Sequence, residues 1–175
     1  MNIRSSESRK LIIASKVGDD EGVSAALRAG ADIHAVEPER HNCTALHWSA
    51  IIGHKKIVIE LLQAGINADI RDDRGRSALH QASFQGLGHI ALLLVGKGVE
   101  IDARDNDDNT PLILASLKGN RDLVKRLLHA GADIQLKNNN GITAILAASM
   151  NGYTSIVSLL VQHGADIRSK DMYGQ

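Results

Sequence analysis

Cys43, the only cysteine of the chain, is followed by two histidines, His47 and His54. Cysteine and histidine are common zinc ligands, and a thiolate beside an imidazole is the usual pairing of a cysteine nucleophile with its base. A zinc site needs three or four converging ligands, and no aspartate or glutamate lies between Cys43 and His54 to complete a set. His54 also comes from the far end of the helix that we expect after Cys43. We therefore expect no metal site and no catalytic residue, and a Cys/His metal or thiol enzyme is the least favoured function.

The same stretch returns further along the chain, which favours a structural explanation. "NCTALHWSAIIGHKK" (42–56) is followed 33 residues later by "GRSALHQASFQGLGH" (75–89), which lacks the cysteine. Two glycine series share this step, namely Gly53, Gly86, Gly119 and Gly152, and Gly65, Gly98, Gly131 and Gly164. A hydroxyl series shares it as well, at Thr44, Ser77, Thr110 and Thr143. Series that stay in register over this length indicate tandem repeats.

Each repeat predicts two short helices and a polar connector. A residue such as Thr44 precedes the first helix and caps its free N–H groups, and a glycine ends that helix. The second helix carries apolar residues at Ile57, Val58, Leu61 and Leu62, which lie on one face. Aromatic residues make up 2% of the chain, so thin layers of aliphatic and small residues must take the place of a large aromatic core.

These features resemble the ankyrin repeat. The likeness is carried by "TALHWSA", "SALHQAS", "TPLILAS" and "TAILAAS", each followed by a glycine and later by "LLQAGINAD", "LVGKGVEID", "LLHAGADIQ" or "LLVQHGADI". The resemblance implies an all-α repeat solenoid, in which β-hairpin-like connectors join helix–turn–helix pairs into a single domain over residues 1–175. We expect repeats at about 5–36, 40–70, 73–103, 106–136 and 139–169, with 170–175 as the start of a possible sixth.

The two ends depart from this pattern. The first repeat lies 35 residues before the second, and we place the two extra residues in "VEPERH" (36–41). Arg9 takes the position of the capping Thr44, so we expect a poorly capped opening helix that begins after Arg9. Because a terminal repeat needs a polar outer face, we expect the chain to be cut from a longer array; in the alternative, the fifth repeat caps the array.

Charge and hydropathy disfavour several partner classes. Twenty basic residues balance twenty acidic ones, whereas proteins that bind duplex nucleic acid usually carry a basic field. No apolar run approaches the roughly 20 residues that span a bilayer, and the polar start "MNIRSSESRK" lacks the apolar core of a secretory signal. We expect a monomer that uses no nucleic acid, membrane or cofactor and is cytoplasmic, with the nucleus or delivery into another cell left open.

Two details of the repeat give structural predictions. Gly75 and Gly141 share a register position with Asn42 and Asp108, and Asn and Asp are the residues that best replace glycine in the left-handed region. We therefore expect a positive φ at these positions. His47 and His80 occupy the histidine of the T-x-L-H pattern, and the resemblance implies that they hydrogen-bond the local turn and the neighbouring repeat.

The resemblance also implies that a protein partner binds the concave side, which is built from the connector tips and one face of each first helix. The candidate residues lie where folding leaves side chains free. On the connectors they are Asp73, Arg74, Arg76, Asn106, Asp107, Asn109, Asn139, Asn140 and Ile142. On the first helices they are Trp48, Ile51, Ile52, Phe84, Gln85, Leu117, Lys118, Met150 and Asn151.

Four of these residues form an apolar series with the repeat's own step: Ile51, Phe84, Leu117 and Met150. One interpretation is an exposed apolar stripe rimmed by polar tips, which is typical of an interaction site. The other is that these side chains fill the gap between helix and hairpin. Sequence leaves this choice open.

The favoured function is thus a non-catalytic module that binds another protein. The alternative is the targeting or substrate-recruiting arm of a longer enzyme or secreted effector whose catalytic part lies outside this chain. Fold alone does not decide between them.

Overall fold

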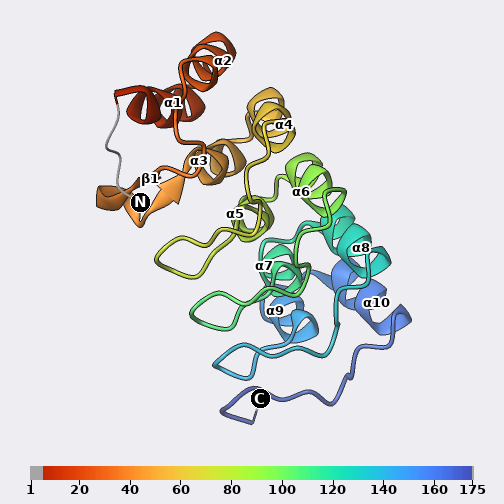
Figure 1. Cartoon of the computed structure of the whole chain (residues 1–175). Helices are drawn as coiled ribbons and strands as arrows, with labels where there is room; N and C mark the ends of the chain where they lie inside the picture. The colour runs from red at the N-terminus through yellow and green to blue at the C-terminus, as the bar shows by residue number, and fades with distance from the viewer. Residues whose placement is uncertain (1–5, 175) are drawn as a thin grey trace.

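The computed structural model describes residues 6–174, which form ten helices in five antiparallel pairs and one small hairpin. The first helices of the pairs are α1 (Ser6–Val17), α3 (Ala45–Ile52), α5 (Ala78–Gln85), α7 (Pro111–Leu117) and α9 (Ala144–Met150). The second helices are α2 (Asp20–Arg28), α4 (Lys55–Gln63), α6 (Gly88–Val95), α8 (Arg121–His129) and α10 (Thr154–Gln162). Figure 1 shows the pairs stacked from one end of the chain to the other. The all-α repeat solenoid is confirmed.

The hydroxyl residues before the first helices act as N-caps. The Thr110 side chain accepts from the Ile113 N–H, and the Thr143 side chain accepts from the Leu146 N–H. Thr44 and Ser77 form capping boxes in which a histidine at the third helical position completes the pair. The serine and threonine series therefore fixes where each of these helices begins.

The opening helix differs from the prediction. α1 starts at Ser6, so Arg9 lies inside the helix and is not its cap, and α1 has 12 residues where α3 has 8. Ser8 is buried and accepts from the Asp32 N–H at 3.0 Å, so packing holds the residues before Arg9 in the helix.

Neighbouring pairs touch mainly through their first helices. α1 packs on α3, α3 on α5, α5 on α7 and α7 on α9, with lesser contacts between successive second helices. Small residues at these contacts, such as Ala82, Ala115 and Ala148, are completely buried and let the helices approach closely. Leucines such as Leu79 and Leu112 fill the space behind them. Each repeat thus completes its core with its neighbour's side chains.

The turn between the two helices of a pair provides a second contact between repeats. Gly119 has a φ of +75°, and a Cβ at this position would lie 2.7 Å from the Tyr153 ring of the next repeat. Asn120 holds the equivalent place one repeat earlier and donates to the Gly86 carbonyl at 2.6 Å. The positive φ angles explain the first glycine series, and close packing adds a second reason at Gly119.

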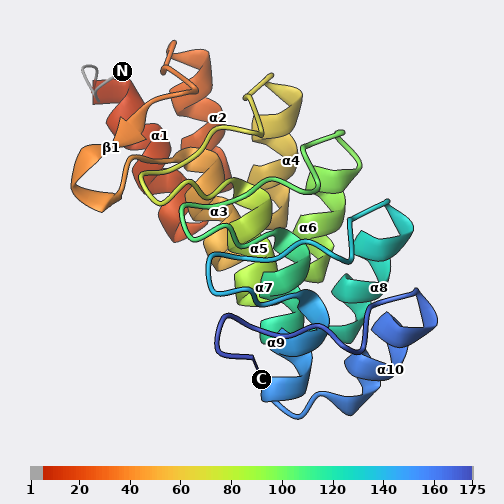
Figure 2. The same ribbon diagram turned by 90° about the horizontal axis from the view of Figure 1, so that it is seen from below.

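The connectors stack on one face of the molecule, beside the first helices (Figure 2). The first connector is the longest and contains β1 (Val36–Glu37), a 3₁₀ turn at Pro38–Arg40, and β2 (Cys43–Thr44). β1 and β2 pair antiparallel, with Val36 opposite Thr44. Asn42 and Asp108 have φ angles of 53° and 59°, and Gly75 and Gly141 are also positive, as predicted.

Three buried serines interrupt the otherwise apolar packing of the first helices. The hydroxyls of Ser15, Ser83 and Ser116 have no hydrogen-bond partner within residues 6–174, although each residue is fully buried. Ala50 takes the same register position in α3 and is equally buried. A desolvated hydroxyl without a partner costs about 1–3 kcal/mol.

We expect Ser83→Ala to raise the free energy of unfolding by about 1 kcal/mol, because it removes this penalty at a position where alanine already fits. Urea denaturation of the variant measures the change. The matched control is Ser49→Ala, because Ser49 is also fully buried but donates to the Leu46 carbonyl at 3.1 Å. The same gain in both variants would show that helix propensity, and not the unpaired hydroxyl, causes it.

Candidate protein-binding surface

One polar side chain organises the tip of each connector that follows α4, α6 and α8. Asp72 Oδ1 accepts from the N–H groups of Arg74 and Arg76, both at 2.9 Å. Asp105 repeats this with Asp107 and Asn109, at 3.0 and 2.8 Å. Asn138 repeats it one step later. Each of these tips therefore folds around one side chain, which accepts hydrogen bonds from the residues that follow it.

Adjacent tips are joined by a ladder of backbone hydrogen bonds. The N–H of Asp73 donates to the His41 carbonyl at 2.9 Å, and that of Asn106 donates to the Arg74 carbonyl at 2.9 Å. The pattern continues from Asn139 to Asp107 at 3.0 Å. The tips consequently form one continuous surface rather than separate loops.

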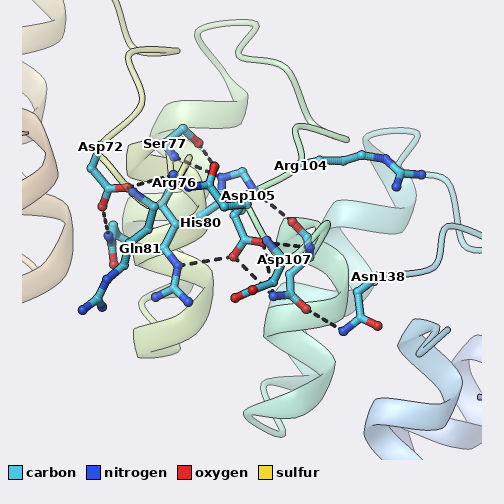
Figure 3. Close-up of polar contacts among 12 residues, drawn as sticks. Asp72, Arg76, Ser77, His80, Gln81, Arg104, Asp105, Asp107 and Asn138 are labelled. Atoms are coloured by element: carbon cyan, nitrogen blue, oxygen red, sulfur yellow. Dashed lines mark hydrogen bonds and ion pairs between the residues drawn. The ribbon is translucent and has the colours of Figure 1, made fainter. Parts of the chain in front are cut away.

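A row of side-chain contacts links the same connectors underneath (Figure 3). Gln81 donates to Asp72 Oδ2 at 2.9 Å, and Arg76 Nε pairs with Asp105 Oδ2 at 3.3 Å. Asn109 contacts Asp105 and accepts from Asn138 at 2.9 Å. We expected Arg76 and Asn109 to be free of the fold, which is wrong, because the buried Asp105 carboxylate holds both.

The candidate binding residues otherwise lie on the surface, and none of them is fully buried. The exposed members are Ile52, Asp73, Arg74, Gln85, Asn106, Asp107, Leu117, Lys118, Asn139, Asn140, Met150 and Asn151. The half-buried members are Trp48, Ile51, Arg76, Phe84, Asn109 and Ile142. Together they form what we call the tip-and-helix surface, which runs along the connector tips and over α3, α5, α7 and α9.

The apolar series divides into two halves. Met150 and Leu117 are 67% and 38% exposed, so the later repeats present apolar side chains to solvent. Ile51 and Phe84 are half-buried, as the alternative interpretation expected. The neighbouring Ile52 is 47% exposed and adds to the apolar area at the first end. The apolar series is thus more deeply buried near the N-terminus than near the C-terminus.

Cations cover both aromatic rings of this surface. Lys16 Nζ lies 4.3 Å from the Trp48 ring centroid and is ion-paired with Glu37, which also accepts from Trp48 Nε1 at 3.1 Å. Lys118 Nζ lies 4.0 Å from the Phe84 ring centroid. Such contacts contribute about 0.5–1 kcal/mol when exposed. They fix the rings in place and add positive charge beside apolar surface.

A pocket of about 330 Å³ opens between the second and third repeats. Its apolar lining comes from Trp48, Ile51 and Phe84, and its polar lining includes Arg74 and Gln85, all of which were predicted. The repeat pattern did not predict Arg40, His41 and Cys43, which also line it. The 35-residue spacing of the first repeat was the available signal, because it showed that the first connector is longer than the others and does not align with them.

The two family-type histidines are structural, as the resemblance implied. His47 Nδ1 lies 3.2 Å from the Thr44 N–H and 2.9 Å from its hydroxyl, and Nε2 lies 2.9 Å from the Arg76 carbonyl. Nδ1 accepts and Nε2 donates, so the ring is neutral. His80 repeats this geometry with Ser77 and Ala103. Burial lowers the pKa of both rings below the ordinary 6.5.

The cysteine and the two histidines do not form a reactive centre. His54 faces the first repeat, with Nε2 3.3 Å from the Lys16 carbonyl, while His47 faces the third. Among residues 6–174, no group of three or more His, Cys, Asp or Glu side chains could hold a metal ion. Burial, together with the negative charges of Asp72 and Glu37, raises the pKa of the Cys43 thiol from 9.0 to about 12.

The fold and this surface define a tandem-repeat scaffold. A family profile described as ankyrin repeats (3 copies) matches residues 11–105 and 86–171. The chain therefore belongs to the ankyrin-repeat family, whose repeats are generally protein-interaction modules and typically non-catalytic. A comparison with curated proteins gives no significant match. None of the helices within residues 6–174 is long and apolar enough to cross a membrane.

The buried histidines predict a loss of stability in mild acid. The unfolded chain takes up protons near pH 6.5, whereas the folded rings resist protonation, so stability is highest above pH 6.5, falls as the pH drops from 6.5 toward the lower folded pKa, and levels off below that pKa. The free energy of unfolding should therefore fall between pH 6.5 and pH 5.5. Urea titrations at both pH values should show a smaller fall in the His80→Leu variant, in which leucine replaces His80 as it does at the equivalent position, Leu146, of the fifth repeat. An unchanged pH slope in the variant would contradict this origin.

The raised pKa predicts an inert thiol at Cys43. A shift from 9.0 to about 12 lowers the thiolate fraction near neutral pH about a thousandfold, and the thiolate is the reactive form. Labelling with a chromogenic disulfide reagent at pH 8 should therefore be slow in the native protein and rapid after denaturation in urea. Rapid labelling of the native protein would revive the thiol-enzyme hypothesis.

Proposed function

We propose that this chain is a non-catalytic module that binds a protein partner through the tip-and-helix surface. The observation that carries the proposal is the exposure of Leu117 and Met150 on first helices whose opposite faces are packed in the core. Folding gives no reason to place apolar side chains at these exposed positions. An apolar strip with a polar rim is typical of protein interaction sites.

The polar rim supports the same interpretation. The tips present arginine in the third repeat, aspartate in the fourth and neutral asparagines in the fifth. Because the ladder holds the tip backbones at a fixed spacing, the backbone does not have to be ordered when a partner binds, which lowers the entropic cost of binding. A mixed rim around an apolar strip matches the surface of another protein better than it matches a uniformly charged polymer.

The central test introduces two charges into the strip. We expect Leu117→Asp with Met150→Asp to reduce partner capture about tenfold or more, because a buried carboxylate without a partner is strongly unfavourable at an interface. Proteins retained by the tagged chain from cells of its source would be quantified by mass spectrometry. Melting temperature should change little, since both side chains are exposed.

Val161→Asp with Ile167→Asp is the matched control, because these apolar residues are also exposed but lie on α10 and the connector after it. Capture of the partner should be unchanged in this control variant. Equal loss of every retained protein from both variants, or full retention by the strip variant, would contradict the proposal.

A further inference from the structure

We infer that the pocket between the second and third repeats binds a short segment of a protein in which an apolar side chain is next to an aspartate or glutamate. The apolar side chain would contact Ile51 and Phe84, and the carboxylate would face Arg74 and Arg40. This inference rests on the proposed function, because it specifies partner chemistry for one part of the same surface.

The floor of the pocket is apolar. Ile51 and Phe84 line it beside Trp48, and all three are half-buried, so each still shows surface inside the pocket. At about 330 Å³ the space accommodates one large side chain and part of its backbone. Apolar area removed from water contributes about 25 cal/mol per Å², which favours an aliphatic or aromatic side chain here.

The carboxylates near this pocket are already engaged by the fold. Asp72 accepts two backbone N–H groups at Oδ1 and the Gln81 amide at Oδ2. Asp105 holds Arg76, and Glu37 holds Lys16. Glu39 is the lining carboxylate that remains exposed.

Three cationic groups, in contrast, have no carboxylate partner within residues 6–174. Arg40 and Arg74 line the pocket, and Lys118 lies over Phe84 at its edge. Arg74 Nη2 contacts the ring nitrogen of His41 at 3.0 Å, which leaves the other nitrogens of the guanidinium for a ligand. Three unpaired cations against Glu39 favour an incoming anion, and arginine binds carboxylates with two parallel hydrogen bonds.

The surroundings argue for a single carboxylate on a peptide rather than a polyanion. Asp73, on the same tip as Arg74, and Asp107, on the next tip, are exposed and would repel a chain of phosphates. The apolar floor also offers no favourable interaction to a charged phosphate group. The pocket is therefore suited to one acidic residue with an apolar neighbour.

The test is a selection of random peptides of about twelve residues, displayed on phage, against the wild-type protein. Enriched peptides should carry Asp or Glu at a constant spacing from Leu, Ile, Met or Phe. Synthetic copies should change the emission of Trp48, the only tryptophan of the chain, which lines the pocket. Arg74→Glu should weaken their binding about tenfold or more. Lys125→Glu, the same charge change at an exposed site on α8, should not.

The outcomes separate the two proposals. Peptides without an acidic preference, or peptides that bind Arg74→Glu as well as wild type, overturn the pocket inference. If such peptides are lost on the Leu117→Asp, Met150→Asp protein, the proposed function stands without the pocket. If no peptide binds wild type better than it binds either the Arg74→Glu protein or the Leu117→Asp, Met150→Asp protein, both proposals fail.

Discussion

The structure depends on a hydrogen-bonding side chain in the tip of each connector that follows α4, α6 and α8. Asp72, Asp105 and Asn138 each close a tight loop by accepting backbone N–H groups from the residues that follow. Asp72 and Asp105 are 6% and 4% exposed, so their desolvation must be offset by these bonds and by Gln81 and Arg76. With the loop closed in this way, each tip backbone meets the next tip in register, and the helices behind it stack.

This arrangement divides the chain into groups that hold the repeats together and groups that do not. The backbone and inner side chains of the connectors are used by the fold, whereas exposed side chains such as Arg74, Asp107 and Asn140 vary freely in charge from repeat to repeat. The first helices show the same division, because Leu112 is buried and Leu117, on the same helix, is exposed. A scaffold of this kind presents different chemistry at each step without changing its core.

Periodicity was sufficient to predict the helix pairs, the caps and the left-handed tips at Asn42 and Asp108, because each depends on residues within one repeat. The ion pair of Arg76 with Asp105 joins side chains of two successive repeats, and this combination is not found at the equivalent positions of the other repeats. The repeat pattern therefore does not predict it. The pocket was missed in part for a similar reason. Arg40 lies in a 3₁₀ turn, and His41 is a second left-handed residue beside Asn42, features that the connectors after α4, α6 and α8 do not share.

The most direct test of this account is native-state hydrogen exchange at the ladder amides of Asp73, Asn106 and Asn139. These residues are exposed, but their N–H groups donate to the preceding tips, so we expect exchange to be slowed about a hundredfold or more relative to an unstructured peptide. Exchange at the rate of an unstructured peptide would mean that the tips are separate mobile loops. It would contradict the claim that the connectors form one continuous, ordered surface.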